Sequence, residues 1–569
     1  VNQIDRWYKR LREEGVPISS ESYVSKEAMV ERPCPDCGGS RLQPQRLCVT
    51  IGGKTISELC SWSLSDLKDF FESLAIPADK QVVGKAITRE LLTRINLLID
   101  IGVGYLSLNR NVSTISGGEA QRVRLSTQIG SGLMGMMYIL DEPSVGLHPR
   151  DGYRIINTLK RLRDIGNTVI VVEHDVETIC SADHIIEMGP GPGIHGGSVV
   201  TQGTVEEIMQ APHSLTGQYL SGRKCIALPV ERRALNGHWI TVRGARQHNL
   251  KDVTVQIPLG VFVCVTGVSG SGKSSLVHDI LYRALQGRVD RRLLPGDAEG
   301  LEGLEQVDSV IRMDQIPIGK SVTSNPATYL GIFDRIRERF AETPQAQRCG
   351  FTHSSFSFNG NLGGRCEECR GRGVIVTPLQ FMPDVETVCP ECKGRRYRKD
   401  VLEVSYRGKN ISEVLALTFE EAAEFFKDEA YVYRKIQVLN RLGLGYMKLG
   451  QSVDTLSGGE CQRLKLATEL TKVKKGHKLY ILDEPTTGLH LADIQRLLDC
   501  LNSLVEAGHT VLVIEHHLDV IKTADYVIDL GPEGGNEGGY IVAVGRPEEV
   551  ARVPESYTGQ YLKAALTLR

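Results

Sequence analysis

The sequence predicts an α/β protein that contains two copies of one unit and a cysteine-rich insertion. Three observations predict this fold. STISGGEAQRVRL and YILDEPSVGLH recur as DTLSGGECQRLKL and YILDEPTTGLH, displaced by 341 and 342 residues. A glycine-rich loop follows a β-branched run, and two C-x-x-C pairs lie between this loop and the second copy. A register kept over so many residues marks a duplicated unit.

The composition narrows the class of protein. The chain has 569 residues, enough for several domains, and a net charge of −2, so a polyanionic partner would need a local basic surface. It has no apolar run of roughly 18 residues or more, and its polar start, VNQIDRWYKRLREEG, is no signal peptide. We therefore expect a cytoplasmic protein that has no membrane-spanning part of its own and does not bind a membrane. Fourteen cysteines in such a chain favour zinc or free thiols over disulfides.

Residues 261–281 predict a strand, a phosphate-binding loop and a helix. The segment VFVCVTGVSGSGKSSLVHDIL contains G-x-x-x-x-G-K-S. Glycines let backbone N–H groups turn towards phosphate oxygens, and the helix start adds positive potential. Lys273 is expected on the β- and γ-phosphates of ATP or ADP, and the Ser274 hydroxyl on Mg²⁺. The other predicted contacts in this loop are Gly267, Gly270, Gly272 and Ser275. A glycine turn without nucleotide is the alternative.

Acidic residues at a strand end complete the predicted chemistry. The apolar run LYILDEP predicts a buried parallel strand that delivers Asp483 and Glu484 at its carboxyl end, where open α/β sheets bind ligands. Asp483 is expected to hold Mg²⁺, and Glu484 to polarise the attacking water. His516, after the strand VLVIE, is the expected γ-phosphate sensor. The first-copy equivalents are Asp141, Glu142 and His174; solvated loop acids are the alternative.

The S-G-G-E blocks resemble the signature motif of ATP-binding-cassette (ABC) ATPases. In that family the signature of one cassette caps the nucleotide held by the phosphate loop of the other. The resemblance therefore implies a composite site with two walls, the first formed by Lys273, Ser274, Asp483, Glu484 and His516, and the second by Ser116, Gly117, Gly118 and Glu119. Gln315, in MDQIPIGK, resembles the Q-loop glutamine of the family.

A second composite site would combine copy-two signature residues with copy-one acids. Its expected members are Ser457, Gly458, Gly459, Glu460, Asp141, Glu142 and His174. The chain contains no second G-x-x-x-x-G-K-[ST]. Either the chain is an N-terminally truncated version of a longer protein, or one of its two sites is inactive.

Four cysteines have the spacing of a structural zinc site. Cys366-x2-Cys369 and Cys389-x2-Cys392 are separated by 19 residues, which suits a closed four-thiolate shell, with a lost or redox site as the alternative. A third pair, Cys34-x2-Cys37, has no evident partners, so a zinc site and free thiols are equally expected there.

The zinc segment is also rich in basic residues, which suits contact with a phosphate backbone. A solvated basic face is the alternative. The predicted DNA contacts are Arg365, Arg370, Arg372, Lys393, Arg395 and Arg396. Two neighbouring segments have their own predictions. Residues 374–387 predict a short hairpin because Pro378 and Pro383 disfavour a core strand. The phenylalanines of 348–359 favour core packing over stacking on DNA.

The motifs together resemble the UvrA family, the damage-recognition ATPases of bacterial nucleotide excision repair. CPDCGGSRL, GVSGSGKSSL, SNPATY, GGRCEECRGRG and IEHHLDVIKTADYVIDLGPEGG all fit its pattern, so the resemblance covers essentially the whole chain. It implies a homodimer that binds damaged double-stranded DNA under ATP control and hands it to UvrB. Family members begin with another phosphate loop, a further zinc module and a UvrB-docking region, which are not visible here.

The repeat and the motifs predict a domain order. The predicted units are a signature domain (1–112), the second half of cassette one (113–222), a linker (223–237), the start of cassette two (238–330), a second signature domain with the zinc module (331–453), and the end of cassette two (454–569).

Other functional classes remain open from the sequence. A UvrA-like paralogue that protects against DNA-binding drugs would share nearly every motif. Ribosomal cassette proteins lack the zinc insertions, and a transporter ATPase pair is disfavoured by them. A structural zinc protein without hydrolysis is disfavoured because Lys273, Asp483 and Glu484 are all present.

Overall fold

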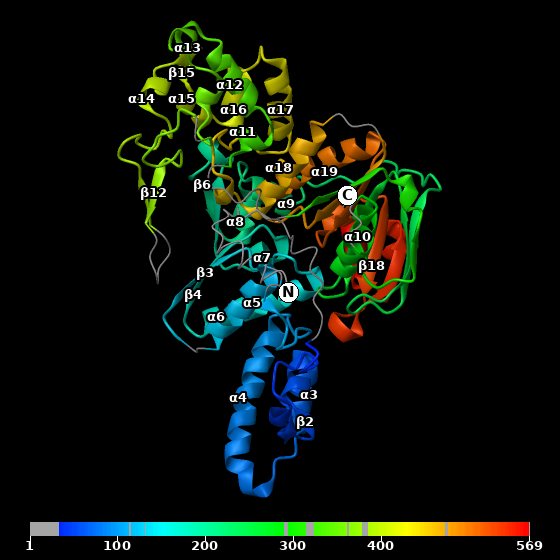
Figure 1. The fold of residues 1–569 in the computed structure, drawn as a ribbon. Coiled ribbons are helices and arrows are strands. Elements are labelled where there is room, and N and C mark those ends of the chain that lie inside the picture. Colours follow the sequence, from blue (N-terminus) through cyan, green and yellow to red (C-terminus); the bar gives the residue numbers. More distant parts are fainter. Residues whose placement is uncertain are drawn as a thin grey trace.

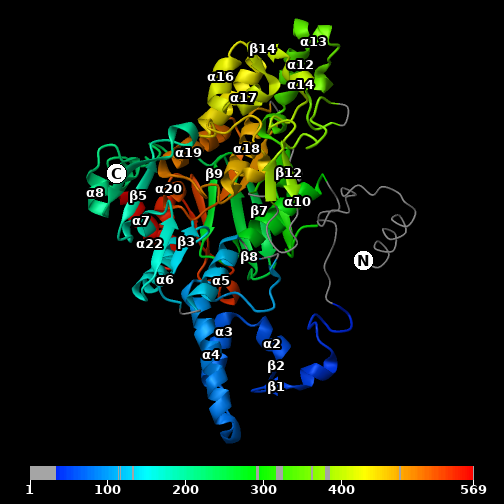
Figure 2. The same ribbon diagram turned by 90° about the vertical axis from the view of Figure 1, so that its left-hand side faces the viewer.

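The protein consists of a central α/β body with one extension at each end. The computed structural model describes residues 34–112, 115, 117–130, 133–289, 294–314, 324–360, 363–377, 385–472 and 476–567. A helical extension that includes α4 (Gln81–Asp100) leaves one end of the body, and a second extension that includes α17 (Ala430–Arg441) leaves the opposite end (Figures 1 and 2). Among these residues, no helix is both long and apolar enough to span a bilayer.

A six-stranded sheet forms the main part of the body. Its order is β11-β16-β17-β9-β18-β19, and every neighbouring pair is parallel except β18 and β19. The strands are β11 (Ser309–Met313), β16 (Lys478–Asp483), β17 (Thr510–Ile514), β9 (Phe262–Gly267), β18 (Tyr526–Gly531) and β19 (Tyr540–Gly545). Every residue of β9 and β17 is buried, as expected of central strands covered on both faces.

A three-stranded antiparallel sheet packs on this body. It has the order β10-β7-β8, with β7 (Trp239–Ala245), β8 (Val253–Pro258) and β10 (Gly300–Glu302). Its apolar side chains share one core with β9, β16, β17 and the π-helical stretch Ser275–Tyr282, which leads into α10 (Arg283–Gly287). This core fixes the start of the helix that follows the glycine-rich loop.

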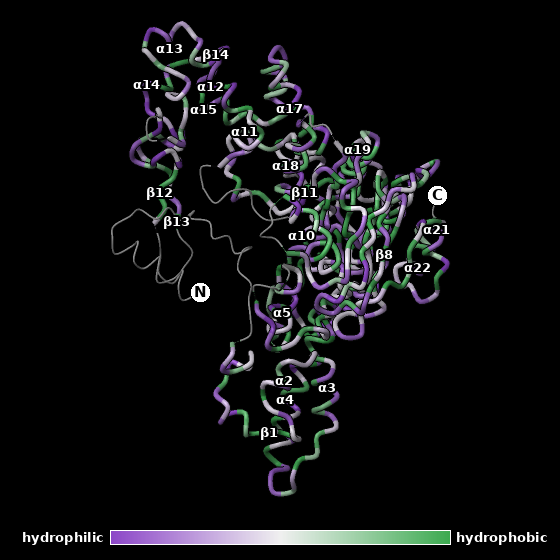
Figure 3. Tube along the Cα trace, turned by 45° about the vertical axis from the view of Figure 1, so that its right-hand side comes forward, coloured by the Kyte–Doolittle hydropathy of each residue, from purple (hydrophilic) through white to green (hydrophobic). Residues whose placement is uncertain are grey.

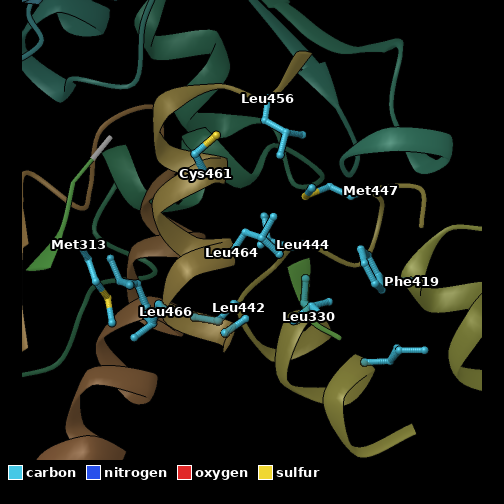
Figure 4. Close-up of a cluster of buried hydrophobic side chains, with 14 of the residues drawn as sticks. Met313, Leu330, Phe419, Leu442, Leu444, Met447, Leu456, Cys461, Leu464 and Leu466 are labelled. Atoms are coloured by element: carbon cyan, nitrogen blue, oxygen red, sulfur yellow. The ribbon is translucent and has the colours of Figure 1, made fainter. Parts of the chain in front are cut away.

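The second extension and the signature helix of copy two share a continuous core. Figure 4 shows Leu464 and Leu466 of that helix, α18 (Gly458–Leu470), close to Met313, Leu330 and Leu442. The extension contains α11 (Pro326–Tyr329), α12 (Phe333–Ala341), α13 (Pro344–Arg348), β12 (Val374–Thr377), β13 (Val385–Val388), α14 (Lys399–Leu402), β14 (Ser405–Tyr406), β15 (Lys409–Asn410), α15 (Ile411–Ala416), α16 (Phe419–Phe425) and α17. The signature helix is thus anchored in this extension as well as in the body.

Copy two ends with helices around the main sheet. These are α19 (Leu491–Glu506), α20 (Leu518–Ile521), α21 (Pro547–Val550) and α22 (Tyr557–Thr567). The predicted hairpin is confirmed, since β12 pairs antiparallel with β13; Pro378 and Pro383 lie outside the described residues. Phe356 and Phe358 are fully buried in the main core, which confirms the prediction of core packing.

Copy one repeats the elements of copy two from β14 to α22 in the same order. They are β1 (Thr50–Ile51), β2 (Lys54–Thr55), α2 (Ile56–Ser61), α3 (Leu64–Ser73), α4, α5 (Gly117–Ile129), β3 (Met137–Asp141), α6 (Pro149–Asp164), β4 (Thr168–Val172), α7 (Val176–Cys180), β5 (Ile185–Gly189), β6 (Ser198–Gly203), α8 (Val205–Gln210) and α9 (Leu215–Leu220). The same local signals recur: Thr55 and Asn410 each form a capping box with the glutamate three residues on. The sequence repeat is therefore also a repeat of structure.

One difference separates the two copies. In copy two β9 lies between β17 and β18, whereas among the described residues no strand joins β4 to β5, so copy one has two separate two-stranded sheets. Apolar strand residues that are buried in copy two are exposed here, for example Ile139 at 70% and Ile186 at 57%. In Figure 3 apolar (green) segments run through the strands of the body, while α4 alternates between polar and apolar.

Candidate active site

The glycine-rich loop leaves the buried end of β9 and wraps around the side chain of Lys273. The Lys273 ammonium donates hydrogen bonds to the carbonyl oxygens of Gly267 and Val268, both at 2.9 Å. Gly267, Gly270 and Gly272 all have positive φ, between 76° and 129°. A Cβ atom on Gly267 would lie 1.9 Å from the carbonyl oxygen of Leu530, so only glycine fits there. Ser274 is exposed beside this loop, and Ser275 is buried.

The neighbouring parallel strands deliver acidic residues to the same edge of the sheet. Asp483 ends β16, and Glu484 follows it with a φ of 43°, a conformation that non-glycine residues rarely adopt. Nε2 of His516, after β17, lies 3.8 Å from Oε1 of Glu484. A strained backbone at this position points to a functional constraint. The carboxylate of Asp483 lies 3.1 Å from Nε2 of His278, in the helix after the loop.

Burial in the site shifts the pKa values of Glu484, Lys273 and His516. Burial, and then the charges of Asp483 and Glu515, raise the pKa of Glu484. Burial lowers the pKa of Lys273 and the pKa of His516. For both Lys273 and Glu484, the penalty for holding charge away from water therefore outweighs their mutual attraction. A bound polyphosphate would supply the negative charge that stabilises the Lys273 ammonium.

A cavity of about 720 Å³ lies between the two copies. One wall carries the glycine-rich loop together with Asp483, Glu484 and His516 from copy two. The facing wall comes from copy one and includes Tyr105, Arg110, Glu119, Arg122 and Gly146. This volume lies within the usual range of about 300–1,000 Å³ for small-molecule sites. The structure thus brings the two expected walls together around one cavity.

The copy-one wall is the start of the signature helix α5. Glu119 is buried in its first turn and accepts a hydrogen bond of 2.5 Å from the hydroxyl of Tyr105. A Cβ atom on Gly118 would lie 2.6 Å from the carbonyl oxygen of Val145, which explains a glycine there. Gly117 begins the helix. Ser116 and Gln315 lie outside the described residues.

The second pair of walls has the same form without a phosphate loop in this chain. Glu142 follows Asp141 with a φ of 43°, and Nε2 of His174 lies 3.9 Å from Oε1 of Glu142. In copy two Ser457 caps α18 through a capping box with Glu460, and Gly458 and Gly459 follow. A Cβ atom on Gly488 would lie 3.1 Å from the Glu142 carboxylate. At both positions a glycine of one copy therefore lies against the acid of the other copy, Gly146 against Glu484 and Gly488 against Glu142.

Sequence reasoning missed several residues of these walls. Tyr105, His278 and Arg122 were not singled out, and His148 was included only as the end of a D-loop-like stretch. Tyr105 and His148 recur as Tyr446 and His490, displaced by 341 and 342 residues. Recurrence in register was the available signal, inside the repeated blocks for Arg122 and His148 and outside them for Tyr105. His278 has no counterpart in copy one, so only its place in the helix after the loop could have suggested it.

Four thiols form a second candidate site in the extension. The ligand atoms of Cys366, Cys369, Cys389 and Cys392 all lie within 4.8 Å of one another, and all four residues are buried. The Sγ atoms of Cys366 and Cys389 are 4.0 Å apart, and those of Cys369 and Cys392 are 3.6 Å apart. A tetrahedral ion with Zn–S bonds of about 2.3 Å requires sulfur separations of about 3.8 Å. The cluster therefore fits zinc.

The other cysteine pair has fewer neighbours. Within the part of the chain that the structure describes, the four-thiol cluster is the one group of three or more potential metal ligands, and Cys34 and Cys37 belong to no such group. Zinc at Cys34 and Cys37 stays a prediction.

The basic residues around the four thiols differ in their surroundings. Arg370, Arg372, Lys393 and Arg395 are exposed, and Arg365 is half-buried. Arg396 is also half-buried: its Nη1 donates to the carbonyl oxygen of Gly450 at 2.8 Å, and its guanidinium lies over the ring of Phe358. Arg396 thus holds the module on the rest of the extension, while the four exposed side chains are open to a partner.

The chain is similar to known proteins along its whole length. It is 54% identical over 569 residues to UvrABC system protein A of Aquifex aeolicus and 52% identical over 567 residues to that of Bacillus subtilis. It covers 61% and 59% of these two relatives, so it spans about three fifths of their length. No model of a protein family matches the chain.

A solved structure agrees with this similarity. The crystal structure of UvrA2 from Deinococcus radiodurans superposes with a TM-score of 0.88 at 44% identity, over 94% of this chain and 66% of that chain. The expected α/β fold with two ABC cassettes, the first incomplete, and a zinc-binding insertion is confirmed. By sequence and by fold, the chain belongs to the UvrA family.

Proposed function

We propose that the chain is an ATP-hydrolysing, DNA-damage recognition subunit of nucleotide excision repair. In this proposal it binds distorted duplex DNA in a nucleotide-controlled way, as a homodimer, and hands the DNA to UvrB. The observation that carries the proposal is the cavity between the copies, with the Lys273 loop on one wall and the signature helix on the other. The UvrABC relatives are more similar to the chain than UvrA2 is, at 54% against 44% identity, which favours repair over a paralogous role.

The residues of the cavity suit ATP hydrolysis. Lys273 would exchange the carbonyl oxygens of Gly267 and Val268 for phosphate oxygens, which are stronger acceptors for an ammonium group. Glu484, held by its strained backbone, would orient the attacking water and accept its proton. His516 beside it would contact the γ-phosphate.

Two oxygen ligands face the cavity where a metal would bind. The hydroxyl of Ser274 and the carboxylate of Asp483 both line it, and oxygen atoms are the ligands that Mg²⁺ prefers. When bound, Mg²⁺ would neutralise charge on the β- and γ-phosphates. Asp483 would then exchange its contact with His278 for the ion.

Closure of the two walls on ATP would couple nucleotide binding to DNA binding. Each signature helix is anchored in an extension of the molecule, α5 with α4 and α18 with α17. Movement of a signature helix towards a nucleotide would therefore move the extension that is packed against it. The α17 extension also carries the cysteine module, the segment from Arg365 to Arg396, with its exposed basic residues. Contact with the phosphate backbone through these residues would sense the shape of the duplex more than its base identity.

Binding to DNA tests this proposal. Fluorescence anisotropy would follow a labelled duplex of about 50 base pairs, with and without a bulky adduct, over a salt series. Each titration would be run with ATP, with ADP and without nucleotide, for the unaltered chain and for Lys273→Ala. We expect preference for the adduct that depends on nucleotide and is lost in the variant.

Binding that ignores adduct, nucleotide and Lys273 would contradict the proposal and indicate a generic basic surface. Transfer to UvrB has a separate test. In native gel electrophoresis, addition of purified UvrB and ATP should produce a more slowly migrating complex with adducted DNA and none with DNA that lacks the adduct.

A further inference from the structure

Tyr105 contacts both walls of the nucleotide cavity. It belongs to copy one, and its hydroxyl donates to Oε1 of Glu119 in the signature helix α5 at 2.5 Å. Its ring lies on Gly270 of the phosphate loop in copy two, where a Cβ atom would come within 2.9 Å of the ring carbons Cδ2 and Cε2. One side chain thus spans the distance between the two elements that must close on a nucleotide.

The ring rests on a turn that hydrogen bonds hold in place. The carbonyl oxygen of Gly270 accepts from the backbone N–H of Gly535 at 3.0 Å and from the amide of Asn249 at 2.9 Å. Gly270 and Gly535 both have positive φ, 76° and 65°. Added Cβ atoms on Gly534 and Gly535 would lie 3.3 Å and 3.1 Å from Tyr105. The ring therefore packs where the phosphate loop meets the loop after β18, and any shift of that turn reaches Tyr105.

The hydroxyl end is bonded to an enclosed carboxylate. Glu119 is 7% exposed, and Nη2 of Arg110 lies 4.0 Å from its second oxygen. Burial and the Glu119 charge raise the pKa of Tyr105, so the phenol keeps its proton and remains a donor. Hydrogen bonds to an ionised acceptor are about twice as strong as neutral ones. Tyr105 and Glu119 should therefore move together.

The same pair exists at the second position, which supplies a matched comparison. The hydroxyl of Tyr446 donates to Glu460 in α18. Its side chain lies on Gly193, the counterpart of Gly535, where a Cβ atom would be 2.4 Å from Cβ of Tyr446. The chain has no second phosphate loop, so Tyr446 has the signature contact and the glycine contact without a counterpart of Gly270.

We propose that Tyr105 is a positioning residue that sets the signature helix α5 against the phosphate loop, so that occupation of the loop by ATP draws α5 towards the nucleotide. The ring follows the loop, and the hydroxyl transmits its position to Glu119. This inference rests on the proposed ATPase function and adds to it the side chain that aligns the two walls.

Two substitutions in the full chain test whether ATP turnover depends on the alignment of the two walls by Tyr105. Tyr105→Phe keeps the ring and removes the hydroxyl, and Tyr446→Phe does the same at the matched position. We expect Tyr105→Phe to lower kcat for ATP at least tenfold, which is the loss expected for a hydrogen bond to a charged group. The dissociation constant for ADP, measured by calorimetry, should change less than twofold, because ADP is held by the Lys273 wall. Tyr446→Phe should keep kcat within twofold.

Hydrogen–deuterium exchange gives a second readout that does not need turnover. ATP with Mg²⁺ should slow exchange in residues 117–129 and 267–282 of the unaltered chain. In Tyr105→Phe the slowing at 267–282 should remain, while that at 117–129 is lost; unchanged exchange in β9 shows that the variant is folded. The inference is overturned if Tyr105→Phe keeps its kcat or its protection of 117–129, or if Tyr446→Phe loses as much. Absence of Lys273-dependent ATP turnover in the unaltered chain would instead overturn the proposed ATPase.

Discussion

The imidazole rings of His148 and His516 meet edge to face with their centroids 6.0 Å apart, although they belong to different copies. His148 is fully buried at the start of α6, where its Nδ1 accepts from the N–H of Arg150 and its Nε2 lies 3.0 Å from Oγ1 of Thr558. Thr558 in turn donates to Asp529 at 2.9 Å. His490 and His174 repeat the contact with centroids 6.4 Å apart. Each histidine that is predicted to sense the γ-phosphate, His516 or His174, therefore contacts a histidine of the other copy.

This burial predicts a dependence of stability on pH. Burial, helped by the charges of Lys273 and Arg150, lowers the pKa of His148 from 6.5 to about 3. Between pH 6.5 and pH 3, His148 is therefore protonated in the unfolded chain but neutral in the folded chain. The contribution of neutral His148 to the free energy of unfolding is complete above pH 6.5 and is lost as the pH falls towards 3. His148 alone should remove about 1.4 kcal/mol per pH unit in this window.

Chemical denaturation between pH 5 and pH 7 measures the effect. His148→Gln should show a smaller decrease in the free energy of unfolding on acidification than the unaltered chain does. His213→Gln, at an exposed histidine, is the control and should keep the original slope. Equal slopes for His148→Gln and the unaltered chain would contradict the prediction.

A glycine of copy one limits the position of the copy-two acid. Gly146 has a φ of 70°, and a Cβ atom there would lie 3.1 Å from Oε2 of Glu484. Gly146→Ala should displace this carboxylate and lower kcat for ATP about tenfold, since misplacing a reacting group by a fraction of an ångström is costly. Gly237→Ala is the matched control, because Gly237 has a φ of 80° with open space around it.

Both alanine variants should lose about 1–3 kcal/mol of stability from backbone strain alone. Thermal melting would check this common loss, and steady-state ATP hydrolysis would separate the two variants. A Gly237→Ala chain as slow as Gly146→Ala would show that general destabilisation, and no contact with Glu484, limits turnover.

The four-thiol cluster predicts the metal content of the chain. Cys389→Ser should lower the zinc-to-protein ratio by about one, because three thiolates and a hydroxyl hold zinc far less tightly than four thiolates. Cys349→Ser, at an exposed cysteine outside the cluster, should leave the ratio unchanged. Mass spectrometry of the metal content measures both. Retention of all zinc by Cys389→Ser would exclude this cluster as the site.

The exposed arginines of the cysteine module predict a salt dependence. If Arg370 and Arg372 each contact one DNA phosphate, the slope of log K against log salt should fall by about 0.9 for each substitution by alanine. Arg163→Ala is the control, since the guanidinium of Arg163, in α6, is paired with Asp183. Anisotropy titrations at several salt concentrations give the slopes. An unchanged slope in the double variant would place the DNA elsewhere.

Much of this fold could be predicted because its signals are local. The glycine spacing after β9 and the apolar run before Asp483 each encode a short segment, and parallel strands bring such segments to one edge. The duplication then extended the prediction to Glu142 and His174. Likewise, the spacing of Cys366, Cys369, Cys389 and Cys392 sufficed to predict that they meet.

The contacts between the copies could not be predicted in this way. The meeting of Tyr105 with Gly270, or of His148 with His516, depends on how two units pack across more than a hundred residues of intervening chain. The three-stranded sheet β10-β7-β8 is another such case, since β10 pairs with β7 across a separation of about 60 residues. The positive φ of Glu142 and Glu484 also has no local signal, because glutamate ordinarily avoids this conformation.

ATP turnover by Glu484→Gln tests the central claim most directly, because the composite cavity is proposed to hydrolyse ATP with this carboxylate. We expect Glu484→Gln to bind ATP as tightly as the unaltered chain but to lose at least a hundredfold in kcat, whereas Lys273→Ala should lose ATP binding itself. Lys472→Ala, at an exposed lysine that pairs with Glu469, controls for a change of surface charge. Unchanged ATP turnover in Glu484→Gln would show that this carboxylate does not activate the attacking water.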